Sequence, residues 1–236
     1  MCESGNAVAQ FDRVLDLIDE VARDARPFRL RTSMILDLHR IALEGLSAYA
    51  GNFRLGSVAI GQSKHVPPQA HLVPSQIEEM CEFVMEYFES ARALHLCAYV
   101  MWRLNWMHPF TDGNGRTSRA LAYFILCTKI GYRLQGHEAL PEQIAADKAP
   151  YYAALEDADS HWAMASLNLS ALGALLDQYL AKQLLSAYDD AKNPGAGVSK
   201  DRKLQWMYQW TVCGYVIVSA PPKRAAIASW STGLLK

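Results

Sequence analysis

The sequence predicts an all-α fold, mainly a helical bundle, with a short β-hairpin flap as its extended element. Apolar residues recur at the three- and four-residue spacing of amphipathic helices over most of residues 11–191. Two of the predicted helices are apolar around most of their circumference and follow one another closely, which favours a buried helical hairpin. The 236-residue chain is 51% hydrophobic and 20% charged, so it has enough apolar material for a sizeable core.

The first elements follow from the apolar period. Apolar stripes within residues 11–22 and 34–46 predict two amphipathic helices. The period then changes, because Val58–Ser63 is bounded by glycines and followed by Pro67-Pro68. This pattern predicts a short extended hairpin over residues 58–65 rather than a helix.

The remaining helices are marked by their ends. Ser75 and Glu78 fit a capping box, so a helix is expected to begin at Ser75. The buried hairpin is expected over residues 91–106 and 116–130, with Gly131 ending its second helix. Two further helices are expected over residues 141–157 and 163–191.

The chain is expected to divide into three parts. Residues 1–192 form one helical domain, and residues 193–199 form a linker because Asn-Pro-Gly-Ala-Gly-Val-Ser combines turn-forming and flexible residues. Residues 200–236 form a small C-terminal tail, for which the sequence suggests no role.

Charge and composition exclude several partners. The 23 basic and 24 acidic residues leave a net charge of −1, which argues against bulk nucleic acid as a ligand. The N-terminus lacks a signal-peptide pattern, and the longest apolar stretch, residues 206–220, is shorter than a membrane span requires. The five scattered cysteines form no C-x-x-C pair, which favours a reducing, cytoplasmic location.

The loop inside the buried hairpin carries the chemistry. Pro109 fixes the backbone directly after His108, so the imidazole leaves the first helix in a defined direction. Asp112 offers a hard carboxylate oxygen suited to Mg²⁺ bound together with phosphate oxygens. Gly113 and Gly115 lack a Cβ and allow a close backbone approach to an anion. The loop therefore has the residue types of a polyphosphate site.

The second helix of the hairpin begins within this loop, and its free N–H groups and positive dipole end point at the loop's ligand. Arg116 and Arg119 lie on one face of its first turn and add two permanent charges, while the Asn114 amide is a further donor. His108 is the candidate proton acceptor, because an imidazole titrates near neutral pH. The arrangement indicates nucleotidyl or phosphoryl transfer.

The motif H-P-F-x-D-G-N-G-R-x-x-R, residues 108–119, resembles the signature of the Fic (Fic/Doc) family at all nine fixed positions. The resemblance extends through most of residues 30–160. His39 followed by Gly51-Asn-Phe-Arg54 is similar to the family's approach to the site, and Val58–His65 is similar to its β-hairpin flap.

This resemblance implies a protein adenylyltransferase whose catalytic domain is residues 1–192. Such an enzyme moves AMP from ATP to a Tyr, Thr or Ser hydroxyl of a target protein and releases pyrophosphate. Carried over by position, the resemblance implies these roles: His108 as general base, Phe110 as structural anchor, Asp112 as the Mg²⁺ ligand, Gly113, Asn114 and Gly115 as the anion hole, Arg116 on the β-phosphate, Arg119 on the γ-phosphate, and Ile60 and Gly61 at the working edge of the target-docking flap.

Alternatives stay open at this point. A phosphotransferase or another nucleotidyl transferase would use the same fold, although the intact Gly113-Asn114-Gly115 favours AMP transfer; a silent nucleotide-binding or scaffold module would more readily lack His108. Many relatives carry an inhibitory [ST]-x-x-x-E-[GN] helix, but Arg40 precedes Glu44-Gly45 in the Ser/Thr position, and Met80 follows Glu79. Three alternatives therefore stay open: a separate antitoxin-like inhibitor, control from elsewhere, or a constitutive enzyme. The sequence is also compatible with a homodimer.

Overall fold

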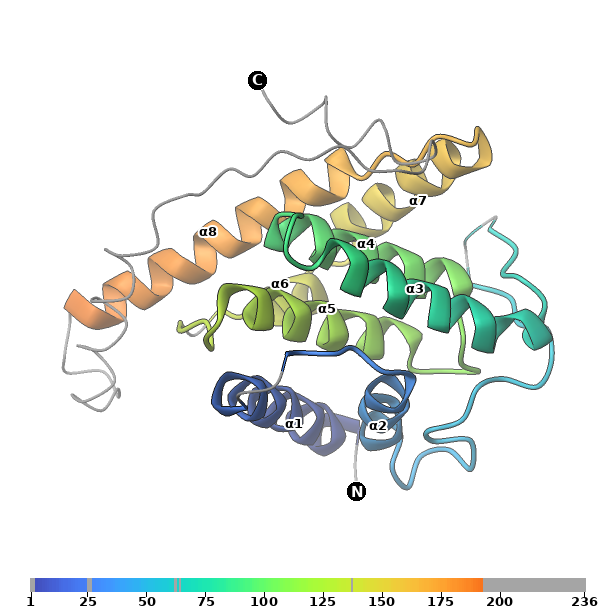
Figure 1. Ribbon diagram of the computed structural model, residues 1–236, viewed down its shortest axis with the longest axis horizontal. Coiled ribbons are helices and arrows are strands. Elements are labelled where there is room, and N and C mark those ends of the chain that lie inside the picture. Colours follow the sequence, from blue (N-terminus) through green and yellow to red (C-terminus); the bar gives the residue numbers. More distant parts are fainter. Residues whose placement is uncertain (1–2, 25–26, 62, 64, 137, 193–236) are drawn as a thin grey trace.

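The computed structural model describes residues 3–24, 27–61, 63, 65–136 and 138–192. Eight α-helices and one short 3₁₀ turn occur within these residues (Figure 1). They are α1 (Glu3–Arg23), α2 (Thr32–Ala42), η1 (Ala70–Leu72), α3 (Val73–Tyr87), α4 (Ala93–Met107), α5 (Asn114–Ile130), α6 (Leu140–Ala146), α7 (Ala149–Ala163) and α8 (Ser170–Lys192). The predicted all-α class is confirmed.

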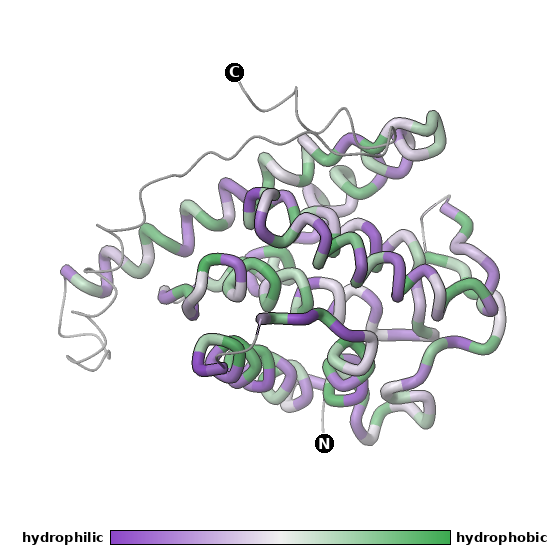
Figure 2. Tube along the Cα trace, in the orientation of Figure 1, coloured by the Kyte–Doolittle hydropathy of each residue, from purple (hydrophilic) through white to green (hydrophobic). Residues whose placement is uncertain are grey.

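Helices α4 and α5 pack against one another at the centre of the bundle, as the sequence predicts (Figure 1). Helices α1 and α2 cover α5, whereas α3, α7 and α8 pack on α4. Figure 2 shows hydrophobic and hydrophilic residues alternating along outer helices such as α3 and α8. The outer helices therefore bury one face each, and the central pair is enclosed from both sides.

The two central helices are joined by the loop that carries the predicted site. Ten of the 15 residues of α4 and 11 of the 17 residues of α5 are buried. Gly131 ends α5 with φ +94°, and its N–H donates to the Cys127 carbonyl at 2.8 Å, which confirms the predicted C-terminus. A loop between two such helices is held firmly at both of its ends.

Three predicted helix boundaries are wrong. Helix α3 begins at Val73 rather than Ser75, with Pro74 in its first turn, and the Ser75 hydroxyl donates to the Leu72 carbonyl at 3.0 Å. The helix expected over 141–157 is two helices, α6 and α7, because Pro150 lacks an N–H and its ring would clash within a continuous helix. The last helix begins at Ser170 rather than at 163.

The expected β-hairpin over residues 58–65 is not formed as a strand pair in the described part of that segment. The Ser63 N–H donates to the Ile60 carbonyl at 2.9 Å, so the segment turns here, as a hairpin would. A two-stranded hairpin without a third strand is marginal in water, which explains a turn without a ladder.

Other predictions concern parts of the chain that lie outside the described residues. The linker at 193–199 and the tail at 200–236 are among them. Within the residues that are described, no helix is both long enough and apolar enough to cross a membrane. Cys81, Cys97 and Cys127 are buried free thiols, as their helical positions predict.

Candidate active site

His108 caps the C-terminus of α4 in a left-handed conformation, with φ 47° and ψ 58°. Its Nδ1 lies 3.3 Å from the Asn105 carbonyl, and a carbonyl only accepts, so Nδ1 carries the proton of the neutral ring. The Nε2 atom is then left with a free lone pair. Burial lowers the pKa of His108, and the nearby Arg54 and His65 lower it further. His108 therefore has the protonation state of a general base near neutral pH.

Asp112 lies exposed in the loop and is oriented by two contacts. Its Oδ1 accepts the Gly113 N–H at 2.6 Å, and its Oδ2 lies 3.2 Å from Nη2 of Arg116. No group of three or more His, Cys, Asp or Glu side chains among the described residues could enclose a metal ion. A cation here would depend on one carboxylate together with ligand oxygens and water, which is the way Mg²⁺ commonly binds with nucleotide phosphates.

Gly113 is required at the start of α5 for two reasons. Its φ of +75° is left-handed, and a Cβ built there would lie 3.2 Å from Cδ2 of Leu43 and 3.3 Å from Cδ2 of His39. The turn directs the first N–H groups of α5 into the loop, where a helix N-terminus favours an anion. Glycine is favoured at position 115 for a different reason. A Cβ there would lie 3.2 Å from Nη1 of Arg119.

Asn114 is buried, and its side chain is used within the loop. Its Oδ1 accepts the Phe110 N–H at 2.9 Å, and its Nδ2 donates to the Phe110 carbonyl at 2.9 Å. One of the two N–H groups of the Asn114 side-chain amide is therefore paired within the loop.

The two arginines differ in their surroundings. Arg116 lies between the carboxylates of Asp112 at 3.2 Å and Glu3 of α1 at 3.1 Å. No carboxylate of the described residues pairs with Arg119; burial lowers its pKa, and Tyr151 and Tyr152 lie near it. Both guanidinium groups belong to the first turns of α5, so the structure brings them together beside the loop.

His39 holds this loop from behind, a role that its spacing in the sequence does not indicate. Its ring stacks on Phe110 with centroids 3.7 Å apart and planes at 7°. Its Nδ1 accepts the Gly51 N–H at 3.0 Å, so Nε2 donates to the Asp112 carbonyl, 3.1 Å away. Both ring nitrogens and the ring face are thus satisfied while the side chain is fully buried. The resemblance of His39 and Gly51-Asn-Phe-Arg54 to the family's approach to the site is the sequence signal that could have indicated this role.

Phe110 and the candidate flap residues Ile60 and Gly61 differ in burial. Phe110 is fully buried between His39 and Phe53. Ile60 is half-buried, and Gly61 is exposed beside it. The His65 Nε2 donates to the Trp106 carbonyl at 2.8 Å, so the end of this segment is attached to α4 close to His108.

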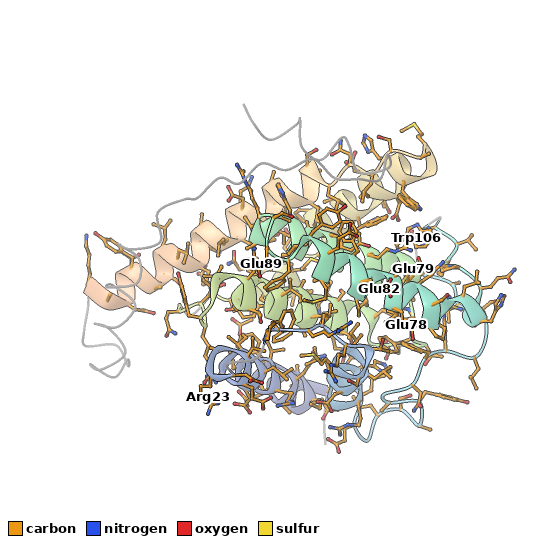
Figure 3. The ribbon with its side chains drawn as sticks, viewed as in Figure 1. Arg23, Glu78, Glu79, Glu82, Glu89 and Trp106 are labelled. Atoms are coloured by element: carbon orange, nitrogen blue, oxygen red, sulfur yellow. The ribbon has the colours of Figure 1, made fainter. Side chains whose placement is uncertain are left out.

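The outer face of α3 has the opposite charge. Glu78, Glu79 and Glu82 are exposed along it, near Trp106 of α4 (Figure 3). This face repels a polyanion, whereas the arginines of α5 attract one.

The sequence model of the Fic/DOC family matches residues 29–126, a segment that contains α2, α3, α4, the loop and most of α5. Residues 29–126 are a Fic/DOC domain. "Protein adenylyltransferase Fic" of Drosophila persimilis is 36% identical over 102 residues, 42% of this chain and 19% of that protein. The protein of the same name from Nematostella vectensis is 29% identical over 134 residues, 53% of this chain and 31% of that protein. The chain thus matches less than a third of each relative's length.

Solved structures contain the same fold. Fic-1 from C. elegans superposes with a TM-score of 0.59 at 22% identity, covering 89% of this chain and 54% of that one. A Fic family protein from Desulfovibrio desulfuricans superposes with a TM-score of 0.58 at 21% identity, covering 87% of this chain and 62% of that one. The shared architecture extends beyond residues 29–126 and includes the helices around the Fic/DOC domain.

Proposed function

We propose that this protein transfers AMP from ATP to a Tyr, Thr or Ser hydroxyl of a target protein and releases pyrophosphate. The observation that carries the proposal is the loop at residues 108–119, where a histidine with a free Nε2 lone pair adjoins the open N-terminus of α5. The names of the relatives matched by the Fic/DOC domain support the same reaction.

His108 acts as the general base in this proposal. The target hydroxyl oxygen attacks the α-phosphorus of ATP, its proton passes to Nε2 of His108, and the bond from the α-phosphorus to the bridging oxygen breaks. Pyrophosphate leaves with the electron pair. The Asn105 carbonyl holds Nδ1–H and so favours the tautomer that accepts a proton at Nε2.

The beginning of α5 holds the phosphates. The backbone N–H groups of Gly113, Asn114 and Gly115 and the positive end of the helix dipole supply fixed donors where charge develops. Arg116 binds the β-phosphate and exchanges its contacts with Asp112 and Glu3 for phosphate oxygens. Arg119, which lacks a carboxylate partner among the described residues, binds the γ-phosphate.

Asp112 is the residue that would hold Mg²⁺ with the nucleotide. Its side chain is 75% exposed, and a carboxylate oxygen is a hard ligand, so its chemistry fits this ion. When bound, Mg²⁺ would neutralise part of the phosphate charge.

The target presents its hydroxyl beside Ile60 and Gly61, and an extended target segment pairs with the backbone of this flap. A separate antitoxin-like inhibitor and a homodimer remain predictions from the sequence. The buried free thiols support a reducing, cytoplasmic compartment for the reaction.

Labelled ATP tests the proposal. The purified protein is incubated with a cell lysate and ATP carrying label at either the α- or the γ-phosphate. We expect label from the α-position alone to become attached to protein. The His108→Ala variant should lose this transfer, whereas His161→Ala, a change on α7, should retain it.

Each other pattern has a defined meaning. Label from the γ-phosphate alone would replace the proposal with phosphorylation. ATP binding without transfer of either label would indicate a silent nucleotide-binding module. Transfer that is equal in His108→Ala and wild type would refute the assignment of the base.

A further inference from the structure

Arg54 is a buried cation that is bound only by backbone carbonyls. It is 2% exposed, and its Nε donates to the His108 carbonyl at 2.8 Å while Nη1 donates to the Gly56 carbonyl at 2.9 Å. Its Nη2 donates to the Pro68 carbonyl and lies 3.4 Å from that of Met107. No carboxylate among the described residues forms an ion pair with it. The whole guanidinium group is therefore committed to main-chain positions.

Two of those carbonyls belong to the C-terminus of α4. The last carbonyls of a helix lack intrahelical donors and carry the negative end of its dipole, so a cation is favourable there. Arg54 supplies that cation, and its own backbone N–H donates to the Pro109 carbonyl at 2.9 Å. The carbonyls and the negative dipole end of α4 therefore offset the cost of burying the Arg54 charge, and they do so at the helix end that carries His108.

This placement bears on the base directly. His108 has φ 47°, a left-handed conformation that a residue with a Cβ keeps only when its surroundings impose it. The Arg54 side chain contacts the carbonyls of Met107 and His108, which lie on either side of the His108 Cα, and the Arg54 backbone N–H donates to the Pro109 carbonyl. Its contacts thus fix the direction in which the His108 ring leaves the helix.

The other two carbonyls belong to the segment that contains the candidate flap. Gly56 lies just before Ile60 and Gly61, and Pro68 lies just after the segment turns back. One side chain consequently holds both ends of the flap segment and the end of α4. A fork of fixed N–H groups can do this, whereas a lysine ammonium on a flexible stem cannot match four separate carbonyl directions.

We propose that Arg54 is a positioning residue that sets the geometry of His108 relative to the target-docking flap. This inference rests on the proposed AMP transfer for its effect on rate. Arg54 touches neither nucleotide nor target in this account, so its loss should reduce the turnover of target protein and leave ATP affinity unchanged. Misplacement of reacting groups by about 1 Å costs on the order of 100-fold in rate.

The test compares Arg54→Lys with Arg103→Lys in the 236-residue chain. Arg103 is also a buried arginine and lies on α4, but its guanidinium packs over Trp106 and Trp162 rather than on the end of the helix. We expect Arg54→Lys to bind ATP within about twofold of wild type and to transfer AMP about 100-fold more slowly. Arg103→Lys should keep its transfer rate within about threefold.

Rescue and spectroscopy separate positioning from folding. Adding methylguanidinium to Arg54→Ala should raise the rate of AMP transfer at least about tenfold, because the added cation refills the site. In nuclear magnetic resonance spectra, the His108 ring and the Gly61 amide should both shift in Arg54→Lys, whereas the Ala187 amide of α8 should not.

Several results would overturn the inference. These are a wild-type rate in Arg54→Lys, an equal loss in Arg103→Lys, or unchanged His108 and Gly61 signals. The inference would also fail if the loss of rate matched the fraction of unfolded protein and methylguanidinium did not restore activity, because Arg54 would then only stabilise the fold. If the wild type transfers no label, the proposed function fails, and the spectra alone decide whether Arg54 positions His108.

Discussion

His108 is a partly buried imidazole whose Nδ1 faces the Asn105 carbonyl and whose pKa is lowered chiefly by burial. A general base works in its neutral form, so AMP transfer should rise with pH as His108 loses its proton. Because the pKa is lowered, half-maximal kcat/KM should occur below the ordinary histidine value of 6.5. A pH profile with labelled ATP measures this midpoint. A rise centred above 6.5 would contradict the proposed state of the base.

Asn114 stabilises the loop through two bonds to one backbone residue, Phe110. Asn114→Ala leaves a buried N–H and a buried C=O unpaired and should lower the free energy of unfolding by about 2–4 kcal/mol. Urea denaturation measures the change. Asn52→Ala is the control, because Asn52 is exposed and bonds only the nearby Ala50 carbonyl, so it should change stability by less than about 0.5 kcal/mol. Equal effects of the two changes would show that the loop does not depend on Asn114.

Residue types in the motif indicated the chemistry of the loop, but not every partner within it. The sequence predicts Asn114 as part of an anion site, but it does not indicate that the Asn114 side chain also forms two hydrogen bonds to the Phe110 backbone. The sequence does not indicate the roles of His39 and Arg54, because both bond backbone carbonyls, which every residue possesses. The spacing of side chains along the sequence therefore cannot identify the partners of these bonds.

At the scale of elements, α5 begins and ends on a left-handed glycine, which provides a matched pair. A Cβ at Gly113 would meet Leu43 and His39, whereas a Cβ at Gly131 would meet nothing within 4 Å. Both alanine variants should lose about 1 kcal/mol from backbone strain, and Gly113→Ala should lose about 1–2 kcal/mol more through packing. Chemical denaturation of the two variants measures the difference. Equal losses would mean that the approach of α2 to the loop is not tight.

The buried helical hairpin was predictable because its helices are apolar around most of their circumference. The ends of helices were less predictable from the sequence. Ser75 resembles an N-cap, although Pro74 already lies inside the first turn of α3. The break before α7 had a signal in Pro150, which a continuous helix cannot accommodate. Within its described residues the flap segment forms a turn without strand pairing. The sequence pattern indicates extended residues, but it does not show whether a partner strand is present.

At the scale of the whole molecule, the site lies on a loop whose two ends are the most enclosed helices of the bundle. Helices α1 and α2 support α5, and α3, α7 and α8 support α4, so neither end of the loop can shift alone. A near-neutral chain with a net charge of −1 can still bind a nucleotide, because Arg116 and Arg119 both lie in the first turns of α5, where the helix N-terminus also favours an anion.

The hydrophobic core also bears on the proposed domain of residues 1–192. Its buried apolar residues lie between Val14 and Ala187 among the described positions. A chain ending at Lys192 should therefore unfold cooperatively, with a Tm within about 5 °C of that of the 236-residue chain. Calorimetry of the two proteins measures this. A truncated chain that unfolds without a cooperative transition would place essential packing after residue 192.

In the proposed reaction, α5 binds ATP and His108 accepts the proton, so loss of either group should have a different effect. ATP affinity by calorimetry and the rate of AMP transfer are measured in parallel for His108→Ala and Arg119→Ala. We expect His108→Ala to bind ATP within about twofold of wild type but to transfer AMP about 10²–10⁴-fold more slowly. We expect Arg119→Ala to lose ATP affinity by about tenfold or more, the loss expected when a charged hydrogen-bond donor is removed. Wild-type transfer by His108→Ala, or loss of its ATP binding together with transfer, would refute these separate roles.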